Sequence, residues 1–277
     1  MRYSSGHATC THGRPYIVTS IGEGNSNALT VEGLAASYAG QPALSNATFA
    51  LESGTITGVL GPNGAGKSTL IKALVGMVKV DSGSVDFGGK TLKQTRSSIA
   101  YIPQRKDIDW TFPINVLDTV LAGTYPKLGL VRRAKKADRE WARECLRMVG
   151  AADLADRHIG ELSGGQQQRI FIARALAQRA DYIFLDEPLT GIDAVSQETI
   201  CTVLIGLKAE GATILMVHHD VVAANDVFDH VLLVNKTVTA AGSPRDVLTQ
   251  AQLASTYGIG RLGAGLEPAF GTGAVDA

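Results

Sequence analysis

The chain has 277 residues, of which 45% are hydrophobic and 19% charged, and its 26 basic and 26 acidic residues give a formal net charge of zero. This balance gives no electrostatic reason to expect a nucleic-acid partner, and the length allows one large domain, or one domain with an inserted lobe. The widely spaced Cys10, Cys145 and Cys201 indicate free thiols in a reducing compartment. No apolar run reaches the roughly 18 residues of a membrane-spanning helix, and no signal peptide is expected.

Regular structure is predicted from residue 28 onward. Residues 1–27 are polar and rich in Gly and Ser, and they are expected to form a flexible extension. Strand-length apolar pieces follow, such as "ALTVEGLAASY" and "TITGVL", separated by turn signals. Apolar residues then recur at helical spacing in "LIKALV", and further strands are predicted at "SVDF" and "SIAYIPQ".

The middle of the chain predicts helices, because apolar positions three and four apart face a charged side from about residue 115 to 149. This pattern indicates a helical lobe, about 105–165, inserted into an α/β domain. Strands and helices then alternate from "DYIFLDEP" to "DHVLLVN", which predicts a mostly parallel sheet covered by helices. The domain is expected to span 28–257, and the Gly- and Ala-rich residues 258–277 to form a disordered tail.

A phosphate-binding loop is the strongest motif. "GPNGAGKS" matches the pattern G-x-x-x-x-G-K-[ST] between a predicted strand and a predicted helix, so backbone N–H groups and the helix dipole would face phosphate oxygens. Lys67 is predicted to reach the β- and γ-phosphates, and the Ser68 hydroxyl to ligate Mg²⁺. The predicted nucleotide-binding residues here are Gly61, Pro62, Asn63, Gly64, Ala65, Gly66, Lys67, Ser68 and Thr69.

Two adjacent carboxylates follow the apolar run "YIFL". Asp186 is predicted to hold Mg²⁺ through water, and Glu187 to act as general base toward the attacking water. The segment "NKTV" resembles the guanine-reading element of GTPases, but its fourth position is Val238, which has no carboxylate. Adenine is therefore the predicted base, and ATP with Mg²⁺ the predicted cofactor.

A second helix start, "LSGGQ", resembles the signature motif of ABC-type ATPases. The resemblance extends from residue 28 to 257, because the phosphate loop, Gln104 in "YIPQ", the signature, the carboxylate pair, Asp193 in "TGID" and His219 in "VHHD" follow in the family's order. It implies a P-loop NTPase (RecA-like) α/β core with an inserted α-helical subdomain and an N-terminal antiparallel β portion.

The resemblance also implies how two copies share ATP. In that family two cassettes pack head to tail, and each ATP lies between the phosphate loop of one chain and the signature of the other. Because this chain has one copy of each motif, it is expected to form a homodimer. The implied contacts from the signature and the interface are Ser163, Gly164, Gly165, Gln166 and Asp193.

Three further roles are implied by the resemblance alone. Tyr38 would stack on adenine, and Gln104 would contact both Mg²⁺ and the attacking water. His219 would hydrogen-bond the γ-phosphate and keep the general base and the water in line. His218 is a rival, but the family's switch histidine directly precedes an acidic residue, as His219 does.

The segment 103–133 resembles the ATPase subunits of manganese, zinc and iron importers. Its matching residues are Arg105, Asp109, Trp110, Phe112 and Pro113. The resemblance implies a polytopic permease that docks near the Gln104 loop and the helical lobe, and indirectly a metal-binding solute-capture protein. The chain would then lie at the cytoplasmic face of the membrane. Alternatively, Trp110 and Phe112 simply fill the core of the lobe.

Manganese is the expected cargo, with zinc, iron or another solute as alternatives, and export as a further one. A soluble ABC ATPase that acts on DNA or ribosomes is the alternative from another class. The neutral charge and the lack of long coiled-coil inserts or a second cassette in this sequence count against it.

Overall fold

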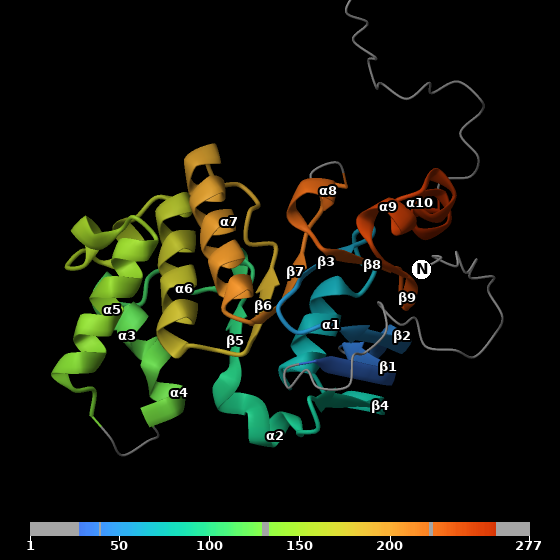
Figure 1. Ribbon diagram of the computed structural model, residues 1–277, viewed down its shortest axis with the longest axis horizontal. Helices are drawn as coiled ribbons and strands as arrows, with labels where there is room; N and C mark the ends of the chain where they lie inside the picture. Colours follow the sequence, from blue (N-terminus) through green and yellow to red (C-terminus); the bar gives the residue numbers. More distant parts are fainter. Residues whose placement is uncertain (1–27, 39, 129–132, 222–223, 259–277) are drawn as a thin grey trace, which may run out of the picture.

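The computed structural model describes residues 28–38, 40–128, 133–221 and 224–258. The expected extension 1–27, Cys10 and the tail beyond residue 258 lie outside this part of the chain. Figure 1 shows two sheets, with a group of helices at one end of the larger one.

A six-stranded sheet positions the site. Its order is β5 (Ile99–Ile102), β6 (Tyr182–Asp186), β7 (Thr213–Val217), β3 (Ile56–Leu60), β8 (His230–Val234) and β9 (Val238–Gly242). The first five strands are parallel, as the sequence predicts, and β9 pairs antiparallel with β8. Since helices or a second sheet cover both faces, β3, β6 and β7 are buried along their whole length.

The antiparallel portion forms a separate three-stranded sheet. Its order is β2 (Gln41–Leu51), β1 (Leu29–Tyr38) and β4 (Val80–Phe87). Helix α1 (Lys67–Leu74) lies between the two sheets, where its Leu70 and Leu74 share a core with Phe49 of the small sheet and Phe184 of the large one. The phosphate-loop helix is therefore fixed from both sides.

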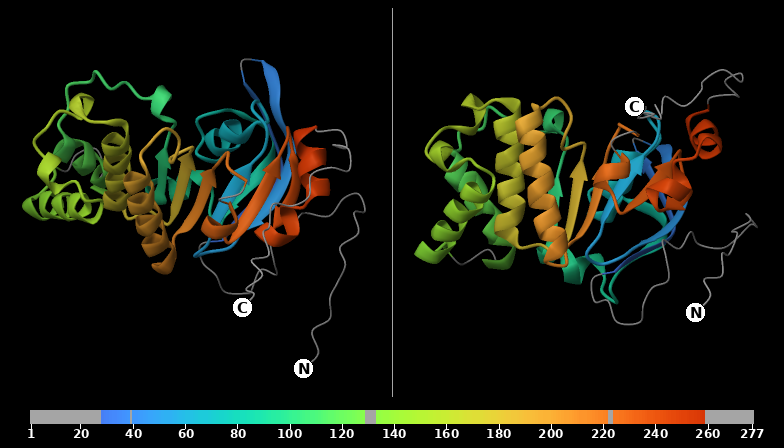
Figure 2. Two further views of the ribbon diagram at one scale, coloured as in Figure 1. Left: turned by 90° about the horizontal axis from the view of Figure 1, so that it is seen from above. Right: turned by 45° about the horizontal axis from the view of Figure 1, so that its top comes forward.

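Helices α6 (Gly164–Gln178) and α7 (Ala194–Ala209) cover the opposite face of the large sheet, and the helical lobe packs on α6. The lobe contains α3 (Val116–Leu121), α4 (Tyr125–Leu128) and α5 (Lys136–Met148). Figures 1 and 2 place the lobe at the end of the molecule away from the small sheet. The predicted helical stretch 115–149 is thus divided into pieces. The turn between α3 and α4 includes Gly123, where a Cβ would collide with the carbonyl oxygen of Arg174 on α6.

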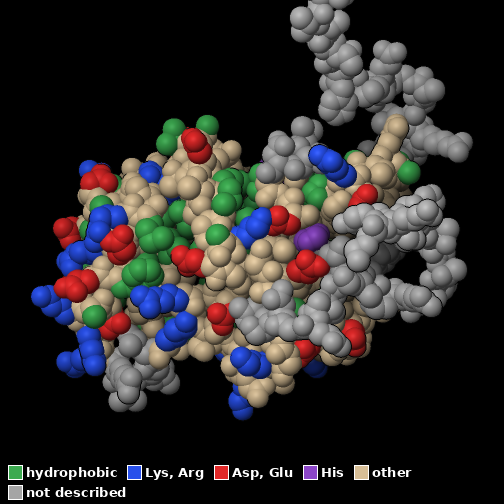
Figure 3. All heavy atoms as spheres, viewed as in Figure 1, with side chains coloured by type: hydrophobic (Ala, Val, Ile, Leu, Met, Phe, Trp, Pro, Cys, Tyr) green, Lys and Arg blue, Asp and Glu red, His purple; other side chains and the backbone are tan. Residues whose placement is uncertain are grey.

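The remaining helices are short. They are α2 (Leu92–Thr95), α8 (Ala224–Val227), α9 (Pro244–Val247) and α10 (Gln250–Tyr257). Lys, Arg, Asp and Glu side chains intermix over the visible face of the lobe (Figure 3). Cys145 is buried and Cys201 half-buried, and both are free thiols. Over the described residues, none of the helices combines the length and apolar character that a membrane crossing requires.

Candidate nucleotide-binding site

The phosphate loop leaves buried strand β3 at Gly61 and enters α1 at Lys67. Gly66 has a φ of 97°, in the left-handed region, and a Cβ there would lie 2.5 Å from the carbonyl oxygen of Ala43 on β2. Only glycine combines this backbone with so close an approach. The start of α1 has no side-chain cap and no acidic residue in its first turn, so its N–H groups are open to an anion.

Lys67 brings a cation into the loop. Its Nζ donates to the carbonyl oxygens of Gly61 (2.8 Å) and Pro62 (3.0 Å). Burial lowers the pKa of the ammonium group, and the carboxylates of Glu187 and Asp186 oppose that change. The site therefore places a buried ammonium group beside the uncapped helix start.

Asp186 lies on the same side of the sheet as α1. Tyr182 and Phe184 of β6 belong to the core around α1, whereas Ile183 and Leu185 belong to the core around the lobe. Because side chains alternate between the two faces of a strand, Asp186 points to the same face as Phe184, toward α1. There its Oδ1 accepts a hydrogen bond from Ser68 Oγ at 2.9 Å.

The oxygens around Asp186 suit a hard cation. Asp186 is 1% exposed, its Oδ2 has no hydrogen-bond partner, and the Gln104 amide donates to its Oδ1 at 3.5 Å. Burial raises the pKa of this carboxyl, and the hydrogen bond from Ser68 opposes the rise. A buried carboxylate oxygen without a donor, beside a hydroxyl and an amide, fits the ligand chemistry of Mg²⁺.

Glu187 has a φ of 53°, a conformation that non-glycine residues seldom adopt, and its side chain faces the open cavity. Such backbone strain gathers at functional sites. The loop behind it carries Thr190, whose hydroxyl lies 3.3 Å from Nδ1 of the exposed His219. His218, by contrast, is 7% exposed and packs edge-to-face on Phe228, with ring centroids 5.8 Å apart. The geometry thus favours His219 over its neighbour as the accessible ring.

The phosphate loop, Gln104 and Glu187 line one cavity of about 610 Å³, whereas His219 is not among its lining residues. The sequence-predicted residues that line it are Tyr38, Asn63, Gly64, Ala65, Gly66, Lys67, Ser68, Thr69, Gln104 and Glu187. Tyr38 is 61% exposed at the edge of this cavity, so its ring face is accessible for stacking. Three predicted residues of the phosphate loop and the carboxylate pair do not line the cavity. Gly61 and Pro62 accept hydrogen bonds from the Lys67 ammonium, and Asp186 accepts one from Ser68.

Five lining residues are absent from the sequence predictions. They are Gln41, Pro42, Ala43, Lys106 and Lys236. The turn between β8 and β9 braces the loop, since Lys236 N–H donates to Ala65 O at 2.8 Å and Lys236 O accepts from Ser45 N–H at 2.7 Å. The only sequence signal at this turn is "NKT", which does not reveal a contact with a loop about 170 residues earlier.

The signature occupies another part of the molecule. Ser163 caps α6, and its Oγ accepts from Gln166 N–H (3.3 Å) while Gln166 Oε1 accepts from Ser163 N–H (2.9 Å). Asp193 caps α7 through Ser196, whose hydrogen bonds hold the pKa of Asp193 below its usual range. A Cβ on Gly165 would collide with both Asp193 and Ser196. The walls of the 610 Å³ cavity, as far as the chain is described, include no residue of the signature.

A mostly parallel sheet, a phosphate loop that leads from β3 into α1, and a carboxylate pair at the end of β6, one strand beyond β7, define the class as a P-loop nucleotide-hydrolysing protein with an inserted helical lobe. The family model described as "ABC transporter" matches residues 44–190. The chain belongs to the ABC transporter family.

Known proteins resemble the chain over most of their length. It is 47% identical over 232 residues to the manganese transport system ATP-binding protein MntB of Bacillus subtilis, across 84% of this chain and 92% of that protein. It is 44% identical over 241 residues to the zinc transport system ATP-binding protein TroB of Treponema pallidum, across 87% and 90%. A solved ABC transporter in an inward-facing conformation matches with a TM-score of 0.73 and 31% identity, across 83% and 88%.

Proposed function

We propose that this chain is the ATP-hydrolysing subunit that energises an ABC importer for divalent metal ions, with manganese as the cargo. The assignment of ATPase activity rests on one cavity. The uncapped start of α1 meets Lys67, Gln104 and Glu187 there. Similarity to manganese transport ATPases supports the cargo, and similarity to a zinc transport ATPase keeps zinc as the alternative.

In this proposal Gln104 contacts both Mg²⁺ and the attacking water, and the other binding residues have one task each. Lys67 and the N–H groups of the loop bind the β- and γ-phosphates, and Tyr38 stacks on adenine. Ser68, Gln104 and Asp186 would hold Mg²⁺, which neutralises phosphate charge when bound.

The chemical step falls to two other residues. Glu187 accepts a proton from the attacking water, and His219 hydrogen-bonds the γ-phosphate and keeps that water in line. The accessibility of His219 and the position of Glu187 on the cavity wall support these roles.

The cavity is completed by a second copy of the chain. The signature residues Ser163 to Gln166 and the adjoining Asp193 lie together, outside the cavity of their own chain. A head-to-tail homodimer brings this group onto the γ-phosphate of ATP held by the partner. The cassette comprises residues 28–257, with the helical subdomain at about 105–165.

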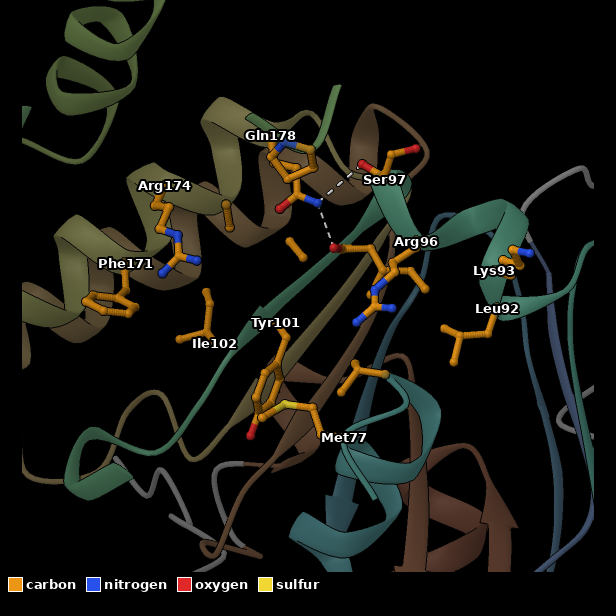
Figure 4. A pocket seen from close by; sticks show the side chains of 15 residues that line it. Met77, Leu92, Lys93, Arg96, Ser97, Tyr101, Ile102, Phe171, Arg174 and Gln178 are labelled. Atoms are coloured by element: carbon orange, nitrogen blue, oxygen red, sulfur yellow. Dashed lines mark hydrogen bonds between the residues drawn. The ribbon is translucent and has the colours of Figure 1, made fainter. Parts of the chain in front are cut away.

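A permease docks in the groove shown in Figure 4, which has a volume of about 660 Å³ between α2, β5 and α6. Its floor includes Leu92, Ile102 and Phe171, while its cations are Lys93, Arg96 and Arg174. No Asp or Glu of the described residues lines it. A short amphipathic helix with an apolar face and a carboxylate complements these walls, and such docking holds the cassette at the cytoplasmic face of the membrane.

Dimer formation tests the shared site. Glu187→Gln should bind ATP without hydrolysing it and should elute from a sizing column as a dimer when ATP is present. The unsubstituted chain in the same buffer, with ATP and without it, is the control. A Glu187→Gln chain that stays monomeric with ATP bound argues against the head-to-tail arrangement.

Elemental analysis tests the cargo. Cells that lack this protein, grown under manganese, zinc or iron limitation, should lose manganese selectively. A selective loss of zinc or iron would reassign the cargo. Co-purification of the chain with ribosomes rather than with a polytopic membrane protein would favour the soluble ATPase instead.

A further inference from the structure

The turn between β8 and β9 holds Lys236 in a backbone conformation that lysine seldom adopts. Its φ is 61°, in the left-handed region, which is uncommon for residues other than glycine. Strain of this kind persists only where the surrounding structure holds it in place, and it gathers at functional sites. The neighbours of Lys236 must therefore fix this turn.

Hydrogen bonds fix the turn from three sides. Lys236 N–H donates to Ala65 O in the phosphate loop at 2.8 Å, and Lys236 O accepts from Ser45 N–H on β2 at 2.7 Å. On the third side, Asn235 Nδ2 donates to Thr256 O on α10 at 2.9 Å. The fold itself therefore sets where the Lys236 backbone lies relative to the phosphate loop.

The Lys236 side chain is an exposed cation on the wall of the nucleotide cavity. Within the described residues it makes no ion pair, unlike Lys72 and Lys208, whose ammonium groups pair with aspartates. Its backbone N–H and carbonyl oxygen are both used by the turn, so the ammonium is the group that can serve a ligand. An unpaired cation on a cavity wall suits an anionic ligand.

The hydrogen bonds of Lys236 also place it at one side of the cavity. Gln104 and Glu187 line the side that adjoins the end of β6. Tyr38 and residues 41–43 line the side formed by the small sheet. Lys236 is hydrogen-bonded to β2 of that sheet, so it lies on the side of the proposed adenine contact rather than on the side of the proposed general base.

We propose that Lys236 is a further nucleotide-binding residue, whose ammonium binds the α- and β-phosphates of the ATP that its own chain holds. The turn then has two tasks, because its backbone supports the phosphate loop while its side chain adds a second cation to Lys67. This inference rests on the ATPase function proposed above. It extends the site to a residue outside the phosphate-loop motif.

Lys236→Asn removes the ammonium without disturbing the turn, because asparagine tolerates a left-handed backbone. The Kd values of the monomer for ATP and for ADP should both rise about fivefold, since both nucleotides carry the α- and β-phosphates. At saturating ATP, kcat should stay within about twofold of the parent value, while KM rises. Lys90→Asn, at an exposed lysine just beyond β4, is the matched control and should change none of these values.

The charge itself is tested by Lys236→Arg and by salt. Lys236→Arg should keep both Kd values within about twofold of the parent, because it keeps the positive charge. Salt screens exposed charges, so the fivefold effect of Lys236→Asn should shrink toward none in about 0.5 M NaCl. An effect of Lys236→Asn that is independent of salt, or an equal loss in Lys236→Arg, would assign it to the turn and overturn the proposal.

The comparison of ATP with ADP separates this inference from the proposed function. If the unsubstituted chain binds neither nucleotide, the proposed ATPase fails and the inference fails with it. If the parent binds both and Lys236→Asn binds them equally well, only the inference fails. A loss confined to ATP would place the ammonium on the γ-phosphate, and a fall in kcat at saturation would place Lys236 in the chemical step. Either result overturns the assignment to the α- and β-phosphates.

Discussion

The two helix starts that the sequence marks for phosphate are built differently. At α1 the residue before the helix, Gly66, is left-handed and supplies no side-chain cap. At α6 Ser163 and Gln166 satisfy each other's backbone N–H groups in a reciprocal capping box. One helix start leaves its donors to a ligand, and the other satisfies them from its own chain.

This difference matches two roles in a shared site. In the proposed dimer the phosphate loop binds nucleotide within one chain, so open donors and the Lys67 cation serve it directly. The signature stays folded in a chain that has no partner, and the Ser163 hydroxyl still has its own hydrogen to donate while it accepts from Gln166 N–H. A capped helix start can therefore still offer a hydrogen bond to the nucleotide of another chain.

Lys67→Ala should produce the largest change, because it removes the cation at the uncapped helix start. ATP affinity of the monomer should fall at least about 100-fold, as expected when a charged partner of the phosphates is lost. Calorimetric titration with ATP measures it, with Lys90→Ala, an exposed lysine beyond β4, as the control. Normal affinity would contradict the phosphate-loop assignment.

Ser163→Arg should distinguish the roles of the two helix starts most clearly. ATP binding to the monomer should stay unchanged, while steady-state turnover falls about 100-fold or more, because the signature serves the partner's nucleotide. Titration and turnover are measured on one preparation. Lost binding in the monomer would show that Ser163 serves its own chain instead.

Gly66→Ala should weaken the fold around α1. Alanine there meets both a left-handed backbone and the Ala43 carbonyl oxygen, whereas Gly64 is left-handed with nothing within 4 Å of its Cβ position. Gly66→Ala should therefore lower the free energy of unfolding by about 1–3 kcal/mol more than Gly64→Ala does. Urea denaturation of both variants measures this, and equal losses would mean that the Ala43 contact is unimportant.

Ser163→Ala should have the smallest effect on stability. Loss of the cap costs about 1 kcal/mol, which lowers the melting temperature by about 2–4 °C in a domain of this size. Ser82→Ala, at an exposed position of β4, is the matched control. A melting temperature equal to that of the parent would show that the capping box adds nothing to the isolated chain.

The sequence motifs name residues that the structure gathers at one cavity, because these motifs follow the ends of buried strands. Ser68 and Asp186 are 118 positions apart, yet alternation along β6 and the helix after β3 are enough to bring them together. No sequence motif or periodicity marks the contacts that support the site. Lys236 reaches the loop through the β8–β9 turn, and Arg105 meets Gln167 only because residues 104–110 fold against α6.

The sequence could not decide whether Trp110 and Phe112 form a docking surface or fill the core of the lobe. The structure divides them: Trp110 packs on Phe171, whereas Phe112 is 61% exposed. Periodicity cannot separate such neighbours, because the segment that holds them is irregular and follows neither helical nor strand spacing.

Lys67 Nζ donates to the carbonyl oxygens of Gly61 and Pro62, the two residues that open the phosphate loop. The same side chain that brings the cation to the cavity therefore also ties the two ends of its own loop together. Sulfate or inorganic phosphate should compete with ATP at this loop, because both offer oxygens to the same ammonium and N–H groups.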